Sequence, residues 1–444
     1  MQDCNYFEFT FCICGAIFYK KVIFSPLFRF LHDGTAQSGN NAMSEKTAKS
    51  MRLQIAIFGR TNAGKSSFIN HITGQQVAIT SNIAGTTTDT VEKTMEFAPF
   101  GPVLFIDTAG LDDTGELGAM RIKKTMKVFD RANAAILLTT AGVWGDTEEE
   151  IVKAAQNSKI KVIAVINKCD QSEPDEKFIQ LLQSRCAAVM TCSCLPDSDR
   201  EKAVSDFRRC LSEALPNDAL KMPPLLGDLV SPGALVVMIV PIDLQAPKGR
   251  LIMPQVQAIR DALDHDAMTL VVKEDRYPEL IKCINPRPQL VICDSQVVKM
   301  MIKNTPSDIP CTTFSVLFSR LKGDTGVFMQ GCAAIASLND GDKVLIAEAC
   351  THHPTCEDIG RVKLPKMLIQ ATGKKLEFVF APGRDFPEDL TGFKLIVHCG
   401  SCMLNRQETL SRIRQAQAAG IPIANYGMAI SYCQGVLDSV LIPQ

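Results

Sequence analysis

One phosphate-binding loop narrows the possible folds more than any other feature of the sequence. Residues 59–66 read Gly-Arg-Thr-Asn-Ala-Gly-Lys-Ser and match the pattern G-x-x-x-x-G-K-[ST]. The apolar run 52–59 precedes the loop and a helical pattern covers 65–73, so the loop joins a buried strand to a helix. In this setting Lys65 contacts the β- and γ-phosphates and Ser66 ligates Mg²⁺. The alternative is a glycine-rich turn that binds nothing.

Two further motifs argue against that alternative and select the base. Asp107-Thr108-Ala109-Gly110 closes an apolar strand, where Asp107 can hold Mg²⁺ through water and the Gly110 N–H can face the γ-phosphate. Asn167-Lys168-Cys169-Asp170 closes another strand, and its carboxylate can accept both N1–H and N2–H₂ of guanine, a contact that adenine cannot offer. Ser193 is a weaker candidate for a base contact. Three motifs in this order predict a GTP-binding domain.

The expected nucleotide site follows from these motifs and from the threonines between them. The expected GTP contacts are Gly59, Asn62, Ala63, Gly64, Lys65, Ser66, Ser67, Thr86, Thr87, Asn167, Lys168 and Asp170. The expected catalytic residues are Lys65, Thr87, Asp107 and Gly110, and the expected Mg²⁺ ligands are Ser66 and Thr87.

The stretch Gly85-Thr86-Thr87-Thr88-Asp89 resembles the switch of the GTPase family that includes Era and TrmE, which also carry an asparagine in the loop, here Asn62. The resemblance implies that Asn62 and the switch backbone bind K⁺ beside the phosphates, where K⁺ supplies the charge of an arginine finger. Leu111 follows the Asp107–Gly110 motif, where Ras-like proteins have a water-orienting glutamine. We therefore expect slow, K⁺-stimulated GTP hydrolysis.

Apolar strands alternate with helical patterns over most of the chain, which predicts an α/β protein. A chain of 444 residues exceeds one core, so several domains are expected. We expect a P-loop GTPase domain with a doubly wound sheet at 51–216, followed by two smaller α/β domains at 225–308 and 311–444. Residues 1–50 are expected to be a disordered or non-native extension and linker, with Met43 as the native start.

Charge and cysteine usage limit the class of partner. The net charge is −1, which argues against a nucleic-acid surface, and no apolar run has the length of a membrane span. We therefore expect a cytoplasmic protein. Its 17 cysteines are scattered, and beside a nucleotide motif they favour reduced thiols and a metal site over a disulfide framework.

A cysteine and histidine constellation lies in the last hundred residues. Cys350 and His352 end one predicted strand, and His398, Cys399 and Cys402 end another. Strand ends are where such ligands project, and the C-x-x-C spacing lets two thiolates face one centre. Three interpretations fit: buried core cysteines, a zinc site with three cysteines and one histidine, or an iron–sulfur cluster with three cysteines and an exchangeable fourth ligand.

From Arg52 to the C-terminus the chain is similar to the HydF family, the GTPases required for maturation of [FeFe]-hydrogenase. The similarity rests on IFGRTNAGKSS at 57–67, on residues 246–264 and 314–324, on CTHHP at 350–354 and on HCGSC at 398–402.

The resemblance implies three domains: a GTPase domain, a dimerisation domain and a cluster-binding domain. It also implies a homodimer or a tetramer. It implies a [4Fe-4S] cluster on Cys350, Cys399 and Cys402, with His352 and His398 as candidates for the fourth site. The family receives a di-iron precursor from two radical-SAM maturases and passes it to the hydrogenase. Two other functions remain open: an RNA- or ribosome-directed GTPase with a zinc-stabilised C-terminal domain, and a redox-sensing GTPase whose cluster regulates hydrolysis.

Overall fold

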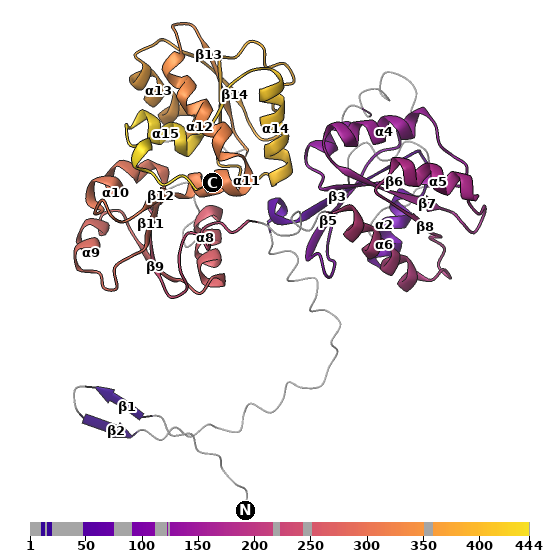
Figure 1. Ribbon diagram of the computed structural model, residues 1–444, viewed down its shortest axis with the longest axis horizontal. Coiled ribbons are helices and arrows are strands. Elements are labelled where there is room, and N and C mark those ends of the chain that lie inside the picture. The colour runs from indigo at the N-terminus through magenta and orange to yellow at the C-terminus, as the bar shows by residue number, and fades with distance from the viewer. Residues whose placement is uncertain are drawn as a thin grey trace, which may run out of the picture. The chain divides into compact units, whose positions relative to one another are not determined.

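The computed structural model describes residues 10–13, 16–19, 48–74, 91–111, 122, 125–215, 223–242, 251–349 and 358–443 (Figure 1). The chain divides into two compact units, Met1–Met43 and Ser44–Gln444. In the first unit, β1 (Thr10–Ile13) pairs antiparallel with β2 (Ala16–Tyr19). Most of the expected extension over residues 1–50 lies outside the described residues. Among the described residues, no helix has the length and apolar character needed to cross a membrane.

The second unit begins with an α/β domain over residues 48–215, here called the nucleotide domain. Its six-stranded sheet has the order β4-β5-β3-β6-β7-β8, with β4 antiparallel to β5 and the other neighbours parallel. The strands are β3 (Leu53–Gly59), β4 (Val91–Glu96), β5 (Pro102–Asp107), β6 (Ala134–Thr140), β7 (Lys161–Asn167) and β8 (Ala188–Thr191). The central strands β3, β6 and β7 are mostly apolar and buried because both sheet faces are covered.

Helices cover both faces of this sheet, as the expected doubly wound fold requires. They are α2 (Lys65–Thr73), α4 (Asp146–Asn157), α5 (Glu176–Arg185) and α6 (Arg200–Ala214), with the short 3₁₀ helices η1 (Lys49–Met51) and η2 (Lys127–Asp130). Phe68 of α2 and Phe207 of α6 share a core on one face, whereas Ile151 of α4 packs on the other. The strand predicted at 52–59 and the helix predicted at 65–73 are confirmed as β3 and α2.

The middle domain contains a smaller parallel sheet with the order β10-β9-β11-β12. Its strands are β9 (Leu235–Ile239), β10 (Met268–Val272), β11 (Leu290–Cys293) and β12 (Cys311–Thr313). Its helices are α8 (Met253–Asp264), α9 (Tyr277–Cys283), η3 (Ser295–Val297), α10 (Val298–Asn304) and α11 (Phe314–Lys322).

The C-terminal domain contains a third sheet, also parallel, with the order β14-β13-β15-β16. Its strands are β13 (Lys343–Ala347), β14 (Glu377–Ala381), β15 (Leu395–His398) and β16 (Ile423–Asn425). Its helices are α12 (Thr325–Ala333), η4 (Ala334–Ser337), the π-helical turn η5 (Ile359–Lys363), α13 (Leu364–Thr372), α14 (Arg406–Ala418), α15 (Tyr426–Cys433) and η6 (Leu437–Ser439). Two smaller α/β domains thus follow the nucleotide domain, as expected.

The boundary between these two domains differs from the expected one. We expected the third domain to open at Cys311, but β12 pairs with β11 in the middle sheet, and Phe314 and Leu317 of α11 pack against that sheet. The middle domain therefore extends to Lys322. A three-residue strand is too short to show a period, and a helical pattern does not say which sheet it covers.

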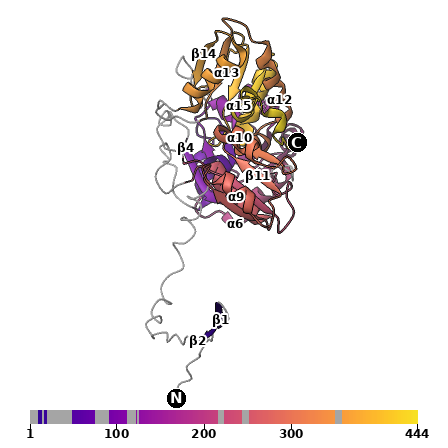
Figure 2. The same cartoon turned by 90° about the vertical axis from the view of Figure 1, so that its left-hand side faces the viewer.

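The two smaller domains share one continuous core. Buried side chains of both sheets, among them Val291 and Val344, belong to the same apolar cluster. In both views α15 lies next to α10, and near the C-terminus the Leu441 N–H donates to the Cys311 carbonyl at 2.6 Å (Figures 1 and 2).

Candidate nucleotide and cluster sites

The loop between β3 and α2 has the backbone of a phosphate cradle. Asn62 (φ 62°) and Gly64 (φ 94°) are in left-handed conformations, and Gly64 is the N-cap of α2. A Cβ at Gly64 would lie 2.3 Å from Nδ2 of Asn167, so this position has no room for a side chain. The Asn167 amide donates to the Ala63 carbonyl at 2.9 Å and so joins the base motif to the loop.

Lys65, Ser66 and Asp107 converge at the mouth of this loop. The Lys65 ammonium donates to the carbonyls of Gly59 (3.0 Å) and Arg60 (2.9 Å), and the Ser66 hydroxyl donates to Oδ2 of Asp107 at 2.6 Å. Burial raises the pKa of Asp107, whereas the Ser66 hydrogen bond and the Lys65 charge lower it. Oδ1 of Asp107 is buried without a partner among the described residues. A hydroxyl beside an unpartnered carboxylate oxygen fits Mg²⁺ coordinated directly or through water.

The guanine motif follows β7 and is supported by the loop after β8. Asn167 ends β7, Lys168 has a positive φ of 60°, and Asp170 is exposed. The Ser193 hydroxyl donates to Oδ1 of Asp170 at 2.7 Å, so Ser193 orients the carboxylate that we expect to bind guanine.

An ion pair that the sequence did not indicate anchors the phosphate loop. Arg60 donates from Nε and Nη2 to the two carboxylate oxygens of Glu148, both at 2.8 Å, and Glu148 is fully buried at the start of α4. The Gly145 N–H donates to the same carboxylate at 2.9 Å. Arg60 therefore positions the loop. No motif marks a pair whose members lie 88 residues apart.

The remaining expected nucleotide contacts lie in the switch segment, at the start of α2 and after β5. Thr86 and Thr87 lie outside the described residues. Ser67 lies in the first turn of α2, and Gly110 follows β5 with Ala109 between it and Thr108. Leu111 is 6% exposed and packs with Phe58 and Phe129 in the core.

The two stretches of the expected cluster site run side by side. β13 and β15 are parallel neighbours, with Ala347 opposite His398. The Ala349 N–H donates to Sγ of Cys399 at 3.0 Å, so the residue that precedes Cys350 lies within hydrogen-bonding distance of a C-x-x-C thiol. Backbone N–H groups directed at cysteine sulfurs are typical of iron–sulfur sites. Cys350 and His352 lie outside the described residues, and the described residues alone contain no metal-binding group of three.

A buried lysine lies beside the second thiol. Lys322, only 1% exposed at the end of α11, donates to the carbonyls of Leu404 (2.8 Å) and Ser50 (3.1 Å). Burial lowers its pKa to about 8, and the nearby Cys402 thiol opposes that shift. Burial also raises the pKa of Cys402, and the charge of Lys322 lowers it. A buried cation next to thiols fits a site that holds anionic thiolates.

His398 has protein partners on both ring nitrogens. Nδ1 lies 2.8 Å from the Cys399 carbonyl, and Nε2 lies 3.2 Å from Nη1 of Arg412. Burial and the Arg412 guanidinium lower the pKa of His398 to about 3, so the ring is neutral. Because Arg412 can only donate, Nε2 accepts and Nδ1–H donates to Cys399. This arrangement fits a role in orienting the cysteine loop better than metal ligation.

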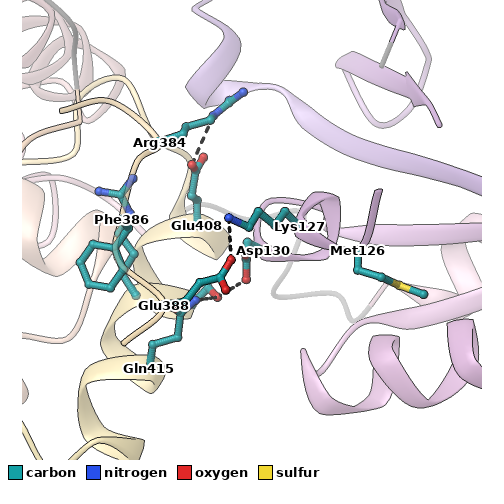
Figure 3. A pocket seen from close by; sticks show the side chains of 10 residues that line it. Met126, Lys127, Asp130, Arg384, Phe386, Glu388, Glu408 and Gln415 are labelled. Carbon is teal, nitrogen blue, oxygen red and sulfur yellow. Dashed lines mark hydrogen bonds and ion pairs between the residues drawn. The ribbon is translucent and has the colours of Figure 1, made fainter. Parts of the chain in front are cut away.

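A cavity of about 410 Å³ lies between η2 of the nucleotide domain and α14 of the C-terminal domain (Figure 3). The Ser411 hydroxyl donates to Oδ1 of Asp130 at 2.6 Å, and Lys127 pairs with Glu388 at 2.9 Å. The Asn405 amide donates to the Arg131 carbonyl at 2.6 Å. The helix that carries Arg412 is therefore bonded directly to the nucleotide domain.

Comparison with protein families divides the chain in three. Residues 225–323 match the model described as the hydrogen maturase F dimerization domain, and residues 326–443 match the hydrogen maturase F tetramerization domain. Residues 54–168 match a GTPase model described as a 50S ribosome-binding GTPase. The chain thus carries a GTPase domain followed by two self-association domains, and the family boundary after residue 323 agrees with the end of α11.

Two similar curated proteins are GTPases that match part of this chain. GTPase Der of Sulfurimonas denitrificans is 32% identical over 139 residues, and GTPase Der of Chloroflexus aurantiacus is 35% identical over 139 residues. Each match covers 30% of this chain and 28% or 30% of the relative, so this chain spans less than a third of their length. Among solved structures, Aquifex aeolicus Era bound to GDP and AlF4⁻ matches with a TM-score of 0.32 and 20% identity over 53% of this chain and 98% of that chain.

Proposed function

This chain belongs to the hydrogen maturase F family, and from that premise we propose that it is a GTP-hydrolysing scaffold that assembles the di-iron precursor of [FeFe]-hydrogenase and transfers it to the hydrogenase. Both self-association models and the GTPase model support the assignment. The observation that carries the cluster role is the hydrogen bond from Ala349 N–H to Sγ of Cys399, because it brings the chain beside Cys350 to the C-x-x-C loop.

In the proposed nucleotide chemistry, Lys65 leaves the loop carbonyls and binds the phosphates, while Ser66, Asp107 and Thr87 hold Mg²⁺. The backbone of Thr86 and Gly110 contacts the γ-phosphate, and Asn62 contributes to a K⁺ site. Burial of Leu111 in the core supports slow hydrolysis, because no side chain from that position can orient the attacking water.

In the proposed cluster site, Cys350, Cys399 and Cys402 hold a [4Fe-4S] cluster. When bound, this group supplies an iron corner that can take an external ligand such as a cyanide nitrogen. Lys322 offsets the negative charge of the thiolates, and His398 fixes the loop through Cys399. His352 remains a candidate for the fourth position, whereas both nitrogens of His398 already have partners.

The proposed partners are a second copy of the chain, in a dimer or tetramer, two radical-SAM maturases and the hydrogenase, all in the cytoplasm. The contact between η2 and α14 would transmit the effect of GTP binding to the surfaces that bind these partners. η2 follows the segment after Leu111, and its Asp130 accepts a hydrogen bond from Ser411 of α14. The next residue of α14, Arg412, donates to His398. We propose that GTP binding favours release of a maturase.

Replacing Cys399 with serine tests this function. The scaffold function predicts that Cys399→Ser abolishes hydrogenase maturation in a reconstituted assay and leaves GTP hydrolysis within about twofold of the wild type. Cys283→Ser is the matched control because Cys283 is an exposed thiol of the middle domain. It should support full maturation.

Two other results would overturn the proposal. Altered GTP hydrolysis in Cys399→Ser would indicate a redox-sensing GTPase, and loss of folding together with bound zinc in the wild type would indicate a structural zinc site. The net charge of −1 gives no support to the RNA-directed alternative.

A further inference from the structure

Two cysteines lie in contact at the guanine end of the nucleotide site. Cys192 and Cys194 flank Ser193 in the loop that follows β8, and their sulfur atoms are 3.8 Å apart. Cys192 is 5% exposed and packs in the core beneath α6, whereas Cys194 is partly exposed. The pair therefore lies at the edge of the core, and Cys194 is the member nearer the surface.

This loop is bonded to the guanine motif at three points. Sγ of Cys194 donates to Oδ1 of Asn167 at 3.3 Å, and Oγ of Ser193 donates to Oδ1 of Asp170 at 2.7 Å. The Cys169 N–H donates to the Cys192 carbonyl at 3.3 Å. Any change in the conformation of residues 192–194 therefore displaces Asn167, which supports the phosphate loop, and Asp170, which we expect to bind the base.

We propose that Cys192 and Cys194 form an intramolecular disulfide on reaction with a peroxide, and that this modification weakens GTP binding. The inference concerns the GTPase domain alone and does not depend on the cluster or on hydrogenase maturation. It assigns a modification site to a pair of thiols that neither the phosphate loop nor the cluster uses.

The reaction balances with hydrogen peroxide as the oxidant. One thiolate attacks a peroxide oxygen, the O–O bond breaks, and a sulfenic acid and one water form after proton transfer. The second thiolate then attacks the sulfenic sulfur, the S–O bond breaks, and a second water leaves. Two protons and two electrons pass from the thiols to the peroxide, which leaves as two molecules of water. The contact between the two thiols lowers the pKa of Cys192, which favours its thiolate as the group that reacts first, and it raises the pKa of Cys194 together with burial.

Closing this bond must move the loop. The sulfur atoms have to approach from 3.8 Å to about 2.05 Å, with a torsion near 90° about the S–S bond. Cys194 then leaves Oδ1 of Asn167, and Ser193 is held in a tight ring that turns its hydroxyl away from Asp170. We expect the Kd for GTP to rise about tenfold, which corresponds to about 1.4 kcal/mol.

The test uses the full-length protein, purified without oxygen. A fluorescent GTP analogue is titrated into reduced protein, into protein treated with a slight excess of hydrogen peroxide, and into treated protein that is reduced again with dithiothreitol. Peptide mass spectrometry measures the fraction of the peptide containing residues 192–194 that has lost about 2 Da and resists alkylation. The proposal predicts that this fraction equals the fraction of weakened sites and that dithiothreitol restores binding.

Two variants make the result specific. Cys192→Ala removes one thiol and should bind GTP as tightly after peroxide as before. Cys210→Ala removes a buried thiol of the same core that bonds to the Val189 carbonyl, and it should respond to peroxide as the wild type does. Equal loss of affinity in Cys192→Ala, or a mapped disulfide with unchanged affinity, would overturn the proposal. The mapping on the wild type decides the question even if a variant fails to fold.

Discussion

Asp170 is the residue on which the choice of base rests in this account. We expect Asp170→Asn to raise the Kd for GTP at least tenfold, about 1.4 kcal/mol. The substitution replaces one accepting carboxylate oxygen with an NH₂ donor, which then faces an N–H donor of guanine. The same variant should bind xanthosine triphosphate more tightly than the wild type, since xanthine has a carbonyl where guanine has an amino group. Calorimetric titration with both nucleotides measures this exchange.

The control for this substitution is Asp197→Asn, which changes an exposed carboxylate of the following loop. Its affinities for the two triphosphates should equal those of the wild type. Unchanged GTP binding in Asp170→Asn would mean that the motif after β7 does not contact the base.

The lowered pKa of Glu92 makes the stability of the nucleotide domain depend on pH. Burial alone would raise the pKa of Glu92, but the hydrogen bonds from Lys49 and Arg131, both at 2.7 Å, and their charges lower it to about 2. Because the folded-state pKa is below the ordinary value of 4.5, this contribution is complete above about pH 4.5 and is lost as pH falls toward 2.

The free energy of unfolding of Glu92→Gln should therefore differ most from that of the wild type at neutral pH, and the difference should shrink toward pH 3. Trp144 is the single tryptophan of the chain and lies in this domain, so its fluorescence follows the unfolding. Glu96→Gln on the same strand, at an exposed position, is the control. A difference that does not vary with pH would contradict the assignment.

How far a residue's role can be predicted from the sequence depends on where its partner lies. Ser66 and Asp107 belong to motifs of known spacing, and the structure brings them to 2.6 Å. Arg60 and Glu148 also form a close pair, at 2.8 Å, yet nothing in the sequence near either residue indicates the other. Contacts between distant segments depend on how helices cover the sheet, and a pattern of local periods does not contain that information.

At the scale of secondary-structure elements, the start of α2 depends on one glycine. Gly64 has a φ of 94°, and a Cβ there would lie 2.3 Å from Asn167. We expect Gly64→Ala to lower the free energy of unfolding by about 1–3 kcal/mol and to abolish measurable GTP binding, because the new methyl group displaces the amide that holds the loop. Trp144 fluorescence in urea and a nucleotide titration measure the two effects.

Gly142→Ala is a matched comparison in the same domain. Gly142 also has a positive φ, 73°, but a Cβ there meets nothing within 4 Å. The Gly142→Ala substitution should lower the free energy of unfolding only by the backbone strain of about 1 kcal/mol, and it should leave the GTP affinity unchanged. Similar effects of the two substitutions would show that strain alone, and not the contact with Asn167, limits Gly64.

The strands and helices could largely be predicted from the sequence, but their assignment to domains could not. The apolar run at 52–59 forms β3, and the helical pattern at 65–73 forms α2. The assignment of β12 and α11 to the middle domain was missed because the sequence gives no indication of which neighbouring sheet a short strand joins.

At the scale of the whole molecule, α14 is the element through which the nucleotide and cluster sites would communicate. Ser411 binds Asp130 at 2.6 Å. We expect Ser411→Ala to leave GTP hydrolysis within about twofold and to remove any difference between GTP and GDP in the dissociation rate of a maturase. Surface plasmon resonance with each nucleotide measures the rates. Gln417→Ala, exposed on the same helix, should keep the difference.

Electron paramagnetic resonance of the reduced, anaerobically purified protein tests the central claim that three cysteines hold a cluster with one open iron. The account predicts a [4Fe-4S]⁺ signal that changes when cyanide or imidazole is added and that disappears in Cys399→Ser. A protein that binds zinc and gives no signal, or a signal that neither ligand alters, would contradict it.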